Sequence, residues 1–138
     1  MNENLTQRGC ETNDKLAFIT HGWRESIDSE WVNLMIGNLT ETRGGCIIFM
    51  DYSFYGINPN YFMFMANFDR ISKVLTKKLN KLESQGYDPD DWFMFGHSAG
   101  ARLLIDAAAN FGYQKVKEID GNLSSFSRFL ILNDILIL

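Results

Sequence analysis

The chain is poor in several residue types that define specialised classes of protein. Its 138 residues include only two prolines, two cysteines and two histidines. So little proline, together with 46% hydrophobic and 22% charged residues, excludes a disordered or collagen-like chain and indicates one globular domain. Cys10 and Cys46 are too few and too far apart to form a zinc site or a Cys-x-x-Cys redox pair. We therefore expect no metal and no other cofactor.

Clustered positive charge and long hydrophobic runs are also lacking. The net charge is −4, and the basic residues form no cluster beyond Lys77 and Lys78, which excludes a typical nucleic-acid partner. Residues 1–14 are polar throughout and contain no secretion leader. The apolar end of the chain, residues 126–138, is too short to span a bilayer. The sequence predicts no transmembrane segment and is silent on oligomeric state.

The two cysteines leave two alternatives, one mutual disulfide or two unpaired thiols. Because Cys46 starts an apolar strand, we expect them not to pair with each other. Three glycosylation sequons, which matter only in a secreted product, begin at Asn4, Asn38 and Asn122.

The chain is organised around the stretch from Asp91 to Leu104. A short apolar run stops at Gly96, Ser98 follows between two glycines, and an alanine- and leucine-rich helical pattern begins at once. This is the layout of a nucleophile elbow, a sharp turn that lifts a serine above the end of a strand. Gly96 and Gly100 are required there because a side chain at either position would obstruct the close passage of strand and helix.

Strands and helices alternate through the rest of the chain. Continuous apolar runs predict buried parallel strands at residues 16–20, 46–52 and 92–95, and a short strand is expected at 115–120. Helical spacing predicts a helix capped by Ser26 or Asp28, one long helix over residues 61–82 that Gly86 ends, and a helix over 99–111. We interpret the methionine and aromatic stripe of the long helix as core packing. The order predicts an α/β fold, with a mostly parallel sheet of about four strands and helices on both faces.

The loop after the first strand, His21-Gly22-Trp23, is the second candidate part of the site. A tetrahedral intermediate of acyl transfer needs two backbone N–H donors, one from the residue after the nucleophile and one from the loop after an earlier strand. Ala99 and Trp23 are placed to supply them, and Gly22 lets the loop turn tightly. We expect His21 to brace this loop and His97 to point away from Ser98, both in structural roles.

Several of these segments resemble the pancreatic-lipase-type family of α/β-hydrolases, especially its arthropod lipase and phospholipase A1 branch. The resemblance lies in residues 18–23, Trp31, residues 48–52 and residues 95–101, and covers roughly residues 15–120. It implies an extracellular enzyme of lipid catabolism that hydrolyses ester bonds in acylglycerols or phospholipids. Ser98 matches the family's nucleophile, and the backbone of Trp23 and Ala99 matches its oxyanion hole.

The chain departs from the family after the fourth strand. The triad aspartate of the family aligns near Asn122 or Leu123, which leaves Asp120 as a weak candidate, and no histidine follows Ser98. A serine without a neighbouring base is a feeble nucleophile. We therefore expect an inactive, truncated lipase-like chain with a polar segment (residues 1–14), a partial hydrolase domain (15–120) and a divergent tail (121–138). The tail could be a packed strand or helix, a membrane-surface segment or, as we favour, sequence foreign to the family. The alternative function is a non-catalytic relative that binds lipid or a partner.

Overall fold

The computed structural model describes residues 5–122, which form a four-stranded parallel sheet with the strand order β2-β1-β3-β4. The strands are β1 (Leu16–Thr20), β2 (Cys46–Met50), β3 (Trp92–His97) and β4 (Glu118–Asn122). Each neighbouring pair is parallel, with Thr20 opposite Gly96 in the central pair. The α/β fold class predicted from the alternating pattern is confirmed.

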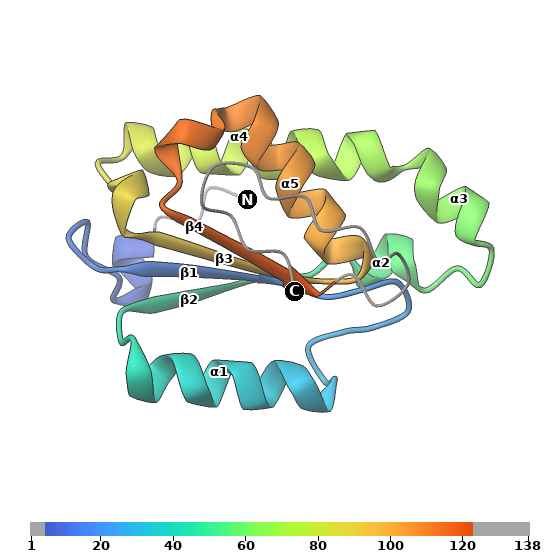
Figure 1. Ribbon diagram of the computed structural model, residues 1–138, viewed down its shortest axis with the longest axis horizontal. Helices are drawn as coiled ribbons and strands as arrows, with labels where there is room; N and C mark the ends of the chain where they lie inside the picture. The colour runs from blue at the N-terminus through green and yellow to red at the C-terminus, as the bar shows by residue number, and fades with distance from the viewer. Residues whose placement is uncertain (1–4, 123–138) are drawn as a thin grey trace.

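Helices cover both faces of this sheet (Figure 1). One face carries α1 (Glu30–Thr42), and the other carries α4 (Phe68–Ser84) and α5 (Ala99–Phe111). Two short helices, α2 (Ser53–Gly56) and α3 (Tyr61–Ala66), lie between β2 and α4 in the chain. Single turns of 3₁₀-helix occur at Leu5–Arg8, Pro89–Asp91 and Tyr113–Lys115.

Alternate residues of the central strands enter two separate cores. Phe18 and Met94 are fully buried in the larger core, to which α4 and α5 contribute. Ala17 and Ile19 belong to the smaller core, which includes Leu39 of α1. Because both faces of β1 are buried, its sequence is continuously apolar rather than alternating.

The predicted long helix is divided at Asn67 into α3 and α4. Asn67 has φ −97° and ψ −4°, and its side-chain amide donates to the carbonyl of Met63 at 2.9 Å, which competes with continuous helical bonding. The stripe is core, as predicted, at Phe64, Phe68, Ile71, Leu75, Leu79 and Leu82, whereas Tyr61 is 43% exposed.

Two other boundaries differ from prediction. The N-cap of α1 is Ser29, rather than Ser26 or Asp28, because those two residues form a preceding turn in which the Asp28 N–H donates to Ser26 Oγ at 3.2 Å. Strand β2 ends at Met50 instead of residue 52, because Tyr52 turns inward and is 95% shielded from solvent beside α2.

Cys10 and Cys46 form a disulfide with 6.0 Å between their Cα atoms, so the expectation of two separate thiols was wrong. The argument from the strand position failed because Cys46 starts an edge strand, where its side chain is only half-buried and within reach of the N-terminal segment. That segment is further held by Leu5, which enters the main core, and by Tyr87, whose hydroxyl donates to the Cys10 carbonyl at 2.8 Å. For a separation of 36 residues the bridge stabilises the fold by about 4 kcal/mol in the chain-entropy model.

Within residues 5–122, no helix combines the length and apolar character needed to cross a membrane. The same part of the chain brings no three potential metal-ligating side chains together. Residues 1–4 and 123–138 lie outside the described residues. They include Asn4, Leu123 and nearly all of the tail. Predictions about the tail therefore stay predictions.

Candidate active site

Ser98 occupies a strained turn between β3 and α5. Its backbone has φ 53° and ψ −117°, a left-handed conformation that is costly for a residue with a side chain. A Cβ on Gly96 would lie 2.5 Å from the Cα and N atoms of Ala101, and one on Gly100 would lie 2.4 Å from the carbonyl oxygen of His21. Both contacts are with backbone, so the turn can form only with glycine at these two positions.

Helix α5 begins directly after Ser98, with Ala99 as its first residue. Within the described residues, the N–H of Ala99 has no hydrogen-bond acceptor. The first N–H groups of a helix carry partial positive charge and point toward its N-terminal end. This end of α5 is therefore suited to an oxyanion formed next to Ser98.

The loop after β1 is braced by His21. The imidazole is fully buried, and its Nδ1 donates to the carbonyl of Gly22 at 2.8 Å. Its Nε2 accepts from the backbone N–H of Tyr52 at 3.2 Å and lies 3.4 Å from Asp51 Oδ1. With both nitrogens engaged in structural bonds, His21 is not poised to act as the base for Ser98.

Tyr52, in the turn between β2 and α2, supports the same loop and was missed by the sequence analysis. Its ring stacks on His21 with 4.1 Å between ring centroids, and its hydroxyl donates to the His21 carbonyl. Burial, aided by the negative charge of Glu25, raises the pKa of Tyr52 above its ordinary value, so the phenol remains a donor. At the neighbouring Asp51, burial acts to raise the pKa, but hydrogen bonds from Ser53 and the proximity of His21 outweigh it and lower the pKa.

Trp23 directs its side chain toward the short helices and leaves its backbone N–H available. The indole Nε1 donates to the carbonyl of Asn58 at 3.1 Å, and the ring meets Tyr61 edge-on with 5.2 Å between centroids. No acceptor for the Trp23 N–H exists among residues 5–122. The two backbone donors predicted for the oxyanion hole, on Trp23 and Ala99, are thus both unpaired in this part of the chain.

The two turns are in direct contact. Thr20, the last residue of β1, is fully buried, and its hydroxyl lies 3.2 Å from the carbonyl oxygen of Gly100 and 3.3 Å from that of Phe95. The close approach of Gly100 to the His21 carbonyl completes this contact. Segments almost 80 residues apart in sequence therefore meet at the carboxyl edge of β1 and β3.

His97 and Glu25 form a second connection between the turns. His97 Nδ1 lies 2.9 Å from Glu25 Oε2, and the two side chains are 26% and 25% exposed. The sequence analysis placed His97 in a structural role but did not identify Glu25. A lone glutamate in a loop has no spacing that distinguishes it, and only the fold places it beside residue 97.

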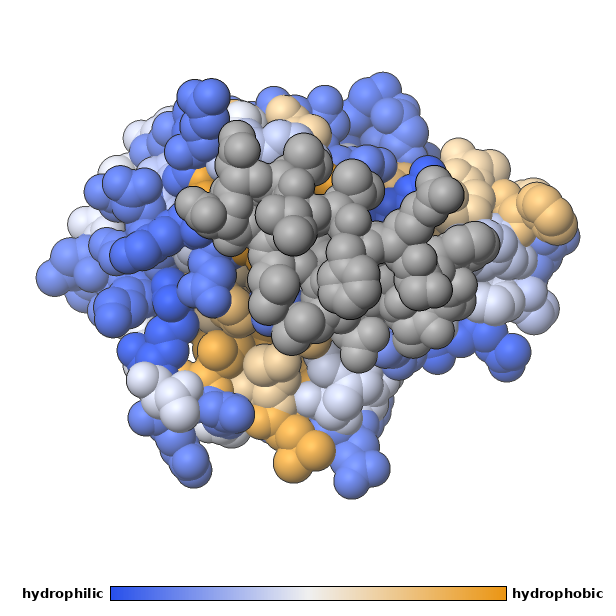
Figure 2. Space-filling model, viewed as in Figure 1, coloured by the Kyte–Doolittle hydropathy of each residue, from blue (hydrophilic) through white to orange (hydrophobic). Residues whose placement is uncertain are grey.

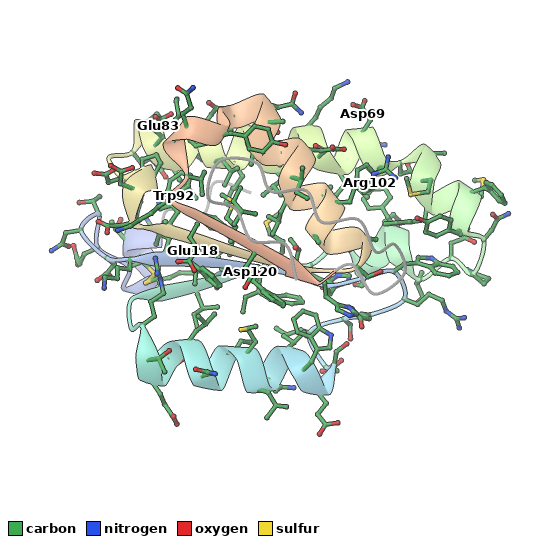
Figure 3. The ribbon with its side chains drawn as sticks, in the orientation of Figure 1. Asp69, Glu83, Trp92, Arg102, Glu118 and Asp120 are labelled. Carbon is green, nitrogen blue, oxygen red and sulfur yellow. A yellow bond between two sulfur atoms is a disulfide. The ribbon has the colours of Figure 1, made fainter. Side chains whose placement is uncertain are left out.

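Asp120 lies within β4 opposite Phe95, two residues before the end of the strand (Figure 3). Its carboxylate accepts a hydrogen bond from the N–H of Gly121 at 2.7 Å. The register places Asn122 opposite His97, so the backbone of Asn122 is closer to the level of Ser98 than that of Asp120 is. The position of the triad acid stays a prediction.

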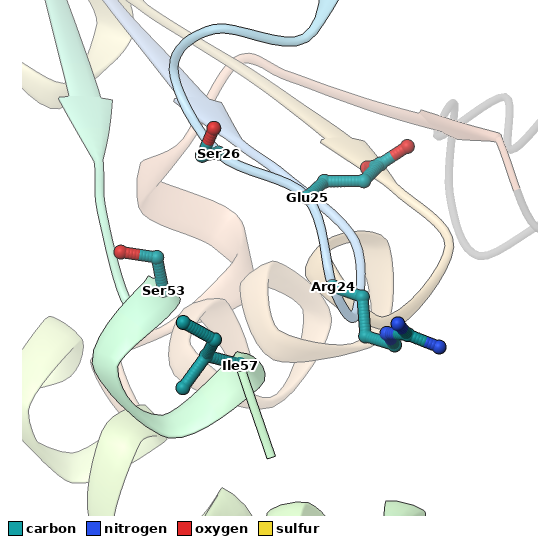
Figure 4. A pocket seen from close by; sticks show the side chains of 5 residues that line it. All are labelled: Arg24, Glu25, Ser26, Ser53 and Ile57. Atoms are coloured by element: carbon teal, nitrogen blue, oxygen red, sulfur yellow. The ribbon is translucent and has the colours of Figure 1, made fainter. Parts of the chain in front are cut away.

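A pocket of about 290 Å³ opens beside the loop after β1 (Figure 4). It is lined by Arg24, Glu25, Ser26, Ser53 and Ile57, and Ser98 is not among the lining residues. In the close view Glu25 points away from Ser53 and Ile57. The pocket therefore adjoins the candidate oxyanion loop without including Ser98, the candidate nucleophile.

Two comparisons relate the chain to known proteins. A family model described as Lipase matches residues 1–121. Lipase member H of Danio rerio is 26% identical over 95 residues, which are 68% of this chain and 21% of that protein. The chain thus spans about a fifth of the length of the curated relative that it matches. Neither match distinguishes the arthropod branch from other branches.

Proposed function

The chain belongs to the lipase family, and on that premise we propose that it carries the nucleophile of a serine carboxylic ester hydrolase acting on acylglycerols or phospholipids. The observation that carries the proposal is Ser98 at φ 53°, held between two obligatory glycines and followed at once by a helix N-terminus. A fold under no pressure to present this hydroxyl has no need of such strain.

The reaction proceeds in two halves. Ser98 Oγ attacks the ester carbonyl carbon while its proton passes to a general base, and the carbonyl oxygen becomes an oxyanion that accepts from the N–H groups of Trp23 and Ala99. The intermediate collapses, the alcohol leaves with a proton, and an acyl-enzyme remains. Water then attacks the acyl group, and the fatty acid departs with the Ser98 hydroxyl restored.

The general base of this scheme lies outside these 138 residues. His21 and His97 are committed to structural hydrogen bonds, and no histidine follows Ser98 in the sequence. In this proposal the base belongs to a later segment of a longer protein, which is supported by the chain spanning only about a fifth of its curated relative. We therefore expect no ester turnover by the 138 residues alone.

The protein is extracellular in this proposal. A disulfide between Cys10 and Cys46 persists in oxidising compartments and is rare in the cytosol. The sequon at Asn38 lies on exposed surface of α1, as a glycosylation acceptor requires.

A second candidate is a non-catalytic protein that binds lipid through the lipase fold. It is favoured by the surface of α2 and α3, where the sequence from Tyr52 to Phe68 has no charged residue. Four apolar side chains are more than half exposed there, at Phe54, Ile57, Phe62 and Met63. Figure 2 shows hydrophobic surface at the end of the molecule where α3 lies. The strained turn at Ser98 argues against this candidate.

The test compares ester turnover by the 138-residue chain with turnover by a form extended through a later histidine. We expect hydrolysis of p-nitrophenyl esters only by the extended form, and labelling of that form at Ser98 by a fluorophosphonate. The matched variant Ser98→Ala removes one oxygen and should abolish both. An extended form that binds phosphatidylcholine vesicles but resists labelling would replace the catalytic proposal with the lipid-binding one.

A further inference from the structure

The carboxylate of Glu25 is the meeting point of three elements. Its Oε2 accepts from the backbone N–H of Gly22 at 2.6 Å and lies 2.9 Å from His97 Nδ1. Its Oε1 accepts from the indole Nε1 of Trp31 at 3.2 Å. One side chain thus joins the loop after β1, the end of β3 and the first turn of α1.

As a carboxylate, Glu25 accepts hydrogen bonds from all three partners. Its oxygens are acceptors without a proton, so His97 must place its own proton on Nδ1 to form the bond. An amide at this position would keep one acceptor oxygen and turn an N–H donor toward either Trp31 or the Gly22 and His97 pair. The Trp31 ring also packs against His97, with 5.3 Å between centroids, which restricts the imidazole to this orientation.

The bonds made by Glu25 flank the two proposed oxyanion donors. Gly22 directly precedes Trp23, and His97 is two residues before Ala99. Within the described residues, one side-chain hydrogen bond joins residues 22–26 to residues 96–100, and it is the bond between Glu25 and His97. The contacts of Thr20 hold the strand ends together but do not reach the loop beyond His21.

We propose that Glu25 is a positioning residue that sets the separation between the N–H groups of Trp23 and Ala99. The inference rests on the proposed function, since that separation matters only if the two donors serve one oxyanion. In this role Glu25 needs no contact with the substrate or the reacting atoms. It acts on the reaction through Gly22 and His97.

The first test is hydrogen exchange in Glu25→Gln, measured on the 138-residue chain and the extended form side by side. We expect amides of residues 22–26 to exchange about tenfold faster, since charge-assisted bonds are lost, while β1 and the melting temperature change little. The matched control is Glu30→Gln, the same change at the exposed first residue of α1, five positions after Glu25. Unchanged exchange in residues 22–26 would overturn the proposal, as would a fall in melting temperature large enough to explain the faster exchange.

The second test is fluorophosphonate labelling of Ser98, separated into a binding constant and a maximal rate. Glu25→Gln should lower the maximal rate with little effect on binding, and Trp31→Phe, which removes one donor and keeps a ring, should lower it less. His97→Asn places an amide N–H near the Nδ1 position. It should therefore retain a higher maximal labelling rate than His97→Ala. Equal rates in these variants and the parent would refute positioning by Glu25. If the parent itself resists labelling, the catalytic function fails, and the exchange experiment alone decides whether Glu25 holds the loop.

Discussion

The two turns that meet at the carboxyl edge of the sheet are held by different kinds of contact. The β3–α5 turn is fixed locally, because backbone atoms within five residues exclude any side chain at Gly96. The loop after β1 is fixed from a distance, by Tyr52 on one side and by His97 on the other. The β3–α5 turn requires a glycine without a side chain at position 96. The loop after β1 requires hydrogen bonds from residues that are distant in the sequence.

The largest effect is expected at Gly100, where the two turns contact each other. In Gly100→Ala the new methyl group would lie 2.4 Å from the His21 carbonyl oxygen and 2.7 Å from that of Thr20, and neither backbone atom can yield without moving β1. We expect a loss of at least about 3 kcal/mol in the free energy of unfolding. Urea unfolding measures it. A loss below about 1 kcal/mol would show that the turn tolerates a side chain and would remove the steric basis of the elbow.

Tyr52→Phe breaks the distant support of the other turn without altering its shape. The His21 carbonyl loses its donor in a buried setting, so the free energy of unfolding should fall by about 1–2 kcal/mol. The loss should also depend on pH. Because burial raises the pKa of Tyr52 in the folded state, its contribution is complete below about pH 10 and declines as the unfolded phenol ionises above that value.

The pH dependence is isolated by subtracting the stability curve of Tyr52→Phe from that of the parent between pH 8 and about 11. Tyr87 and Tyr113, whose pKa values are also raised by burial, are present in both proteins and cancel. A difference that stays constant above about pH 10 would contradict the assignment of the shift to Tyr52.

Gly22→Ala tests how much the loop can adapt. The added Cβ would lie 2.8 Å from Glu25 Oε2 and 3.2 Å from His97 Nδ1, both of which are ends of side chains. We expect Glu25 to move and its short bond with the Gly22 N–H to weaken, at a cost of about 1 kcal/mol. Chemical denaturation compares this variant with Gly100→Ala. Equal losses would mean that both turns are equally rigid and would remove the contrast between them.

The smallest effect is expected from Gly37→Ala, the control for both glycine variants. No atom lies within 4 Å of the position where its Cβ would be, and the residue is exposed on α1. Alanine should therefore stabilise the protein by about 0.5–1 kcal/mol through helix propensity. A destabilisation measured in the same denaturation assay would indicate a contact on α1 that the described residues do not supply.

The contrast between the turns also explains what could be predicted from the sequence. The elbow and the bounds of β1 follow from residues that are neighbours in the chain, and both were predicted before the fold was known. The division of the long helix at Asn67 was not predicted, because the helical spacing of apolar residues continues across it. The feature that marks the break is the hydrogen bond from the Asn67 side chain to the Met63 carbonyl. Glu25 and the Cys10–Cys46 pair were missed for a related reason. Their partners are 72 and 36 residues away, and no local pattern marks such pairs.

The disulfide encloses β1, the loop with Trp23 and all of α1 in one covalent ring, while Ser98 lies outside it. A protease that cut after the exposed Arg24 would leave both pieces attached to the rest of the molecule. Such a nicked protein would migrate as a single band on a non-reducing gel and separate into fragments only after thiol treatment. Trypsin would thus cleave the loop after β1 without releasing either fragment from the protein.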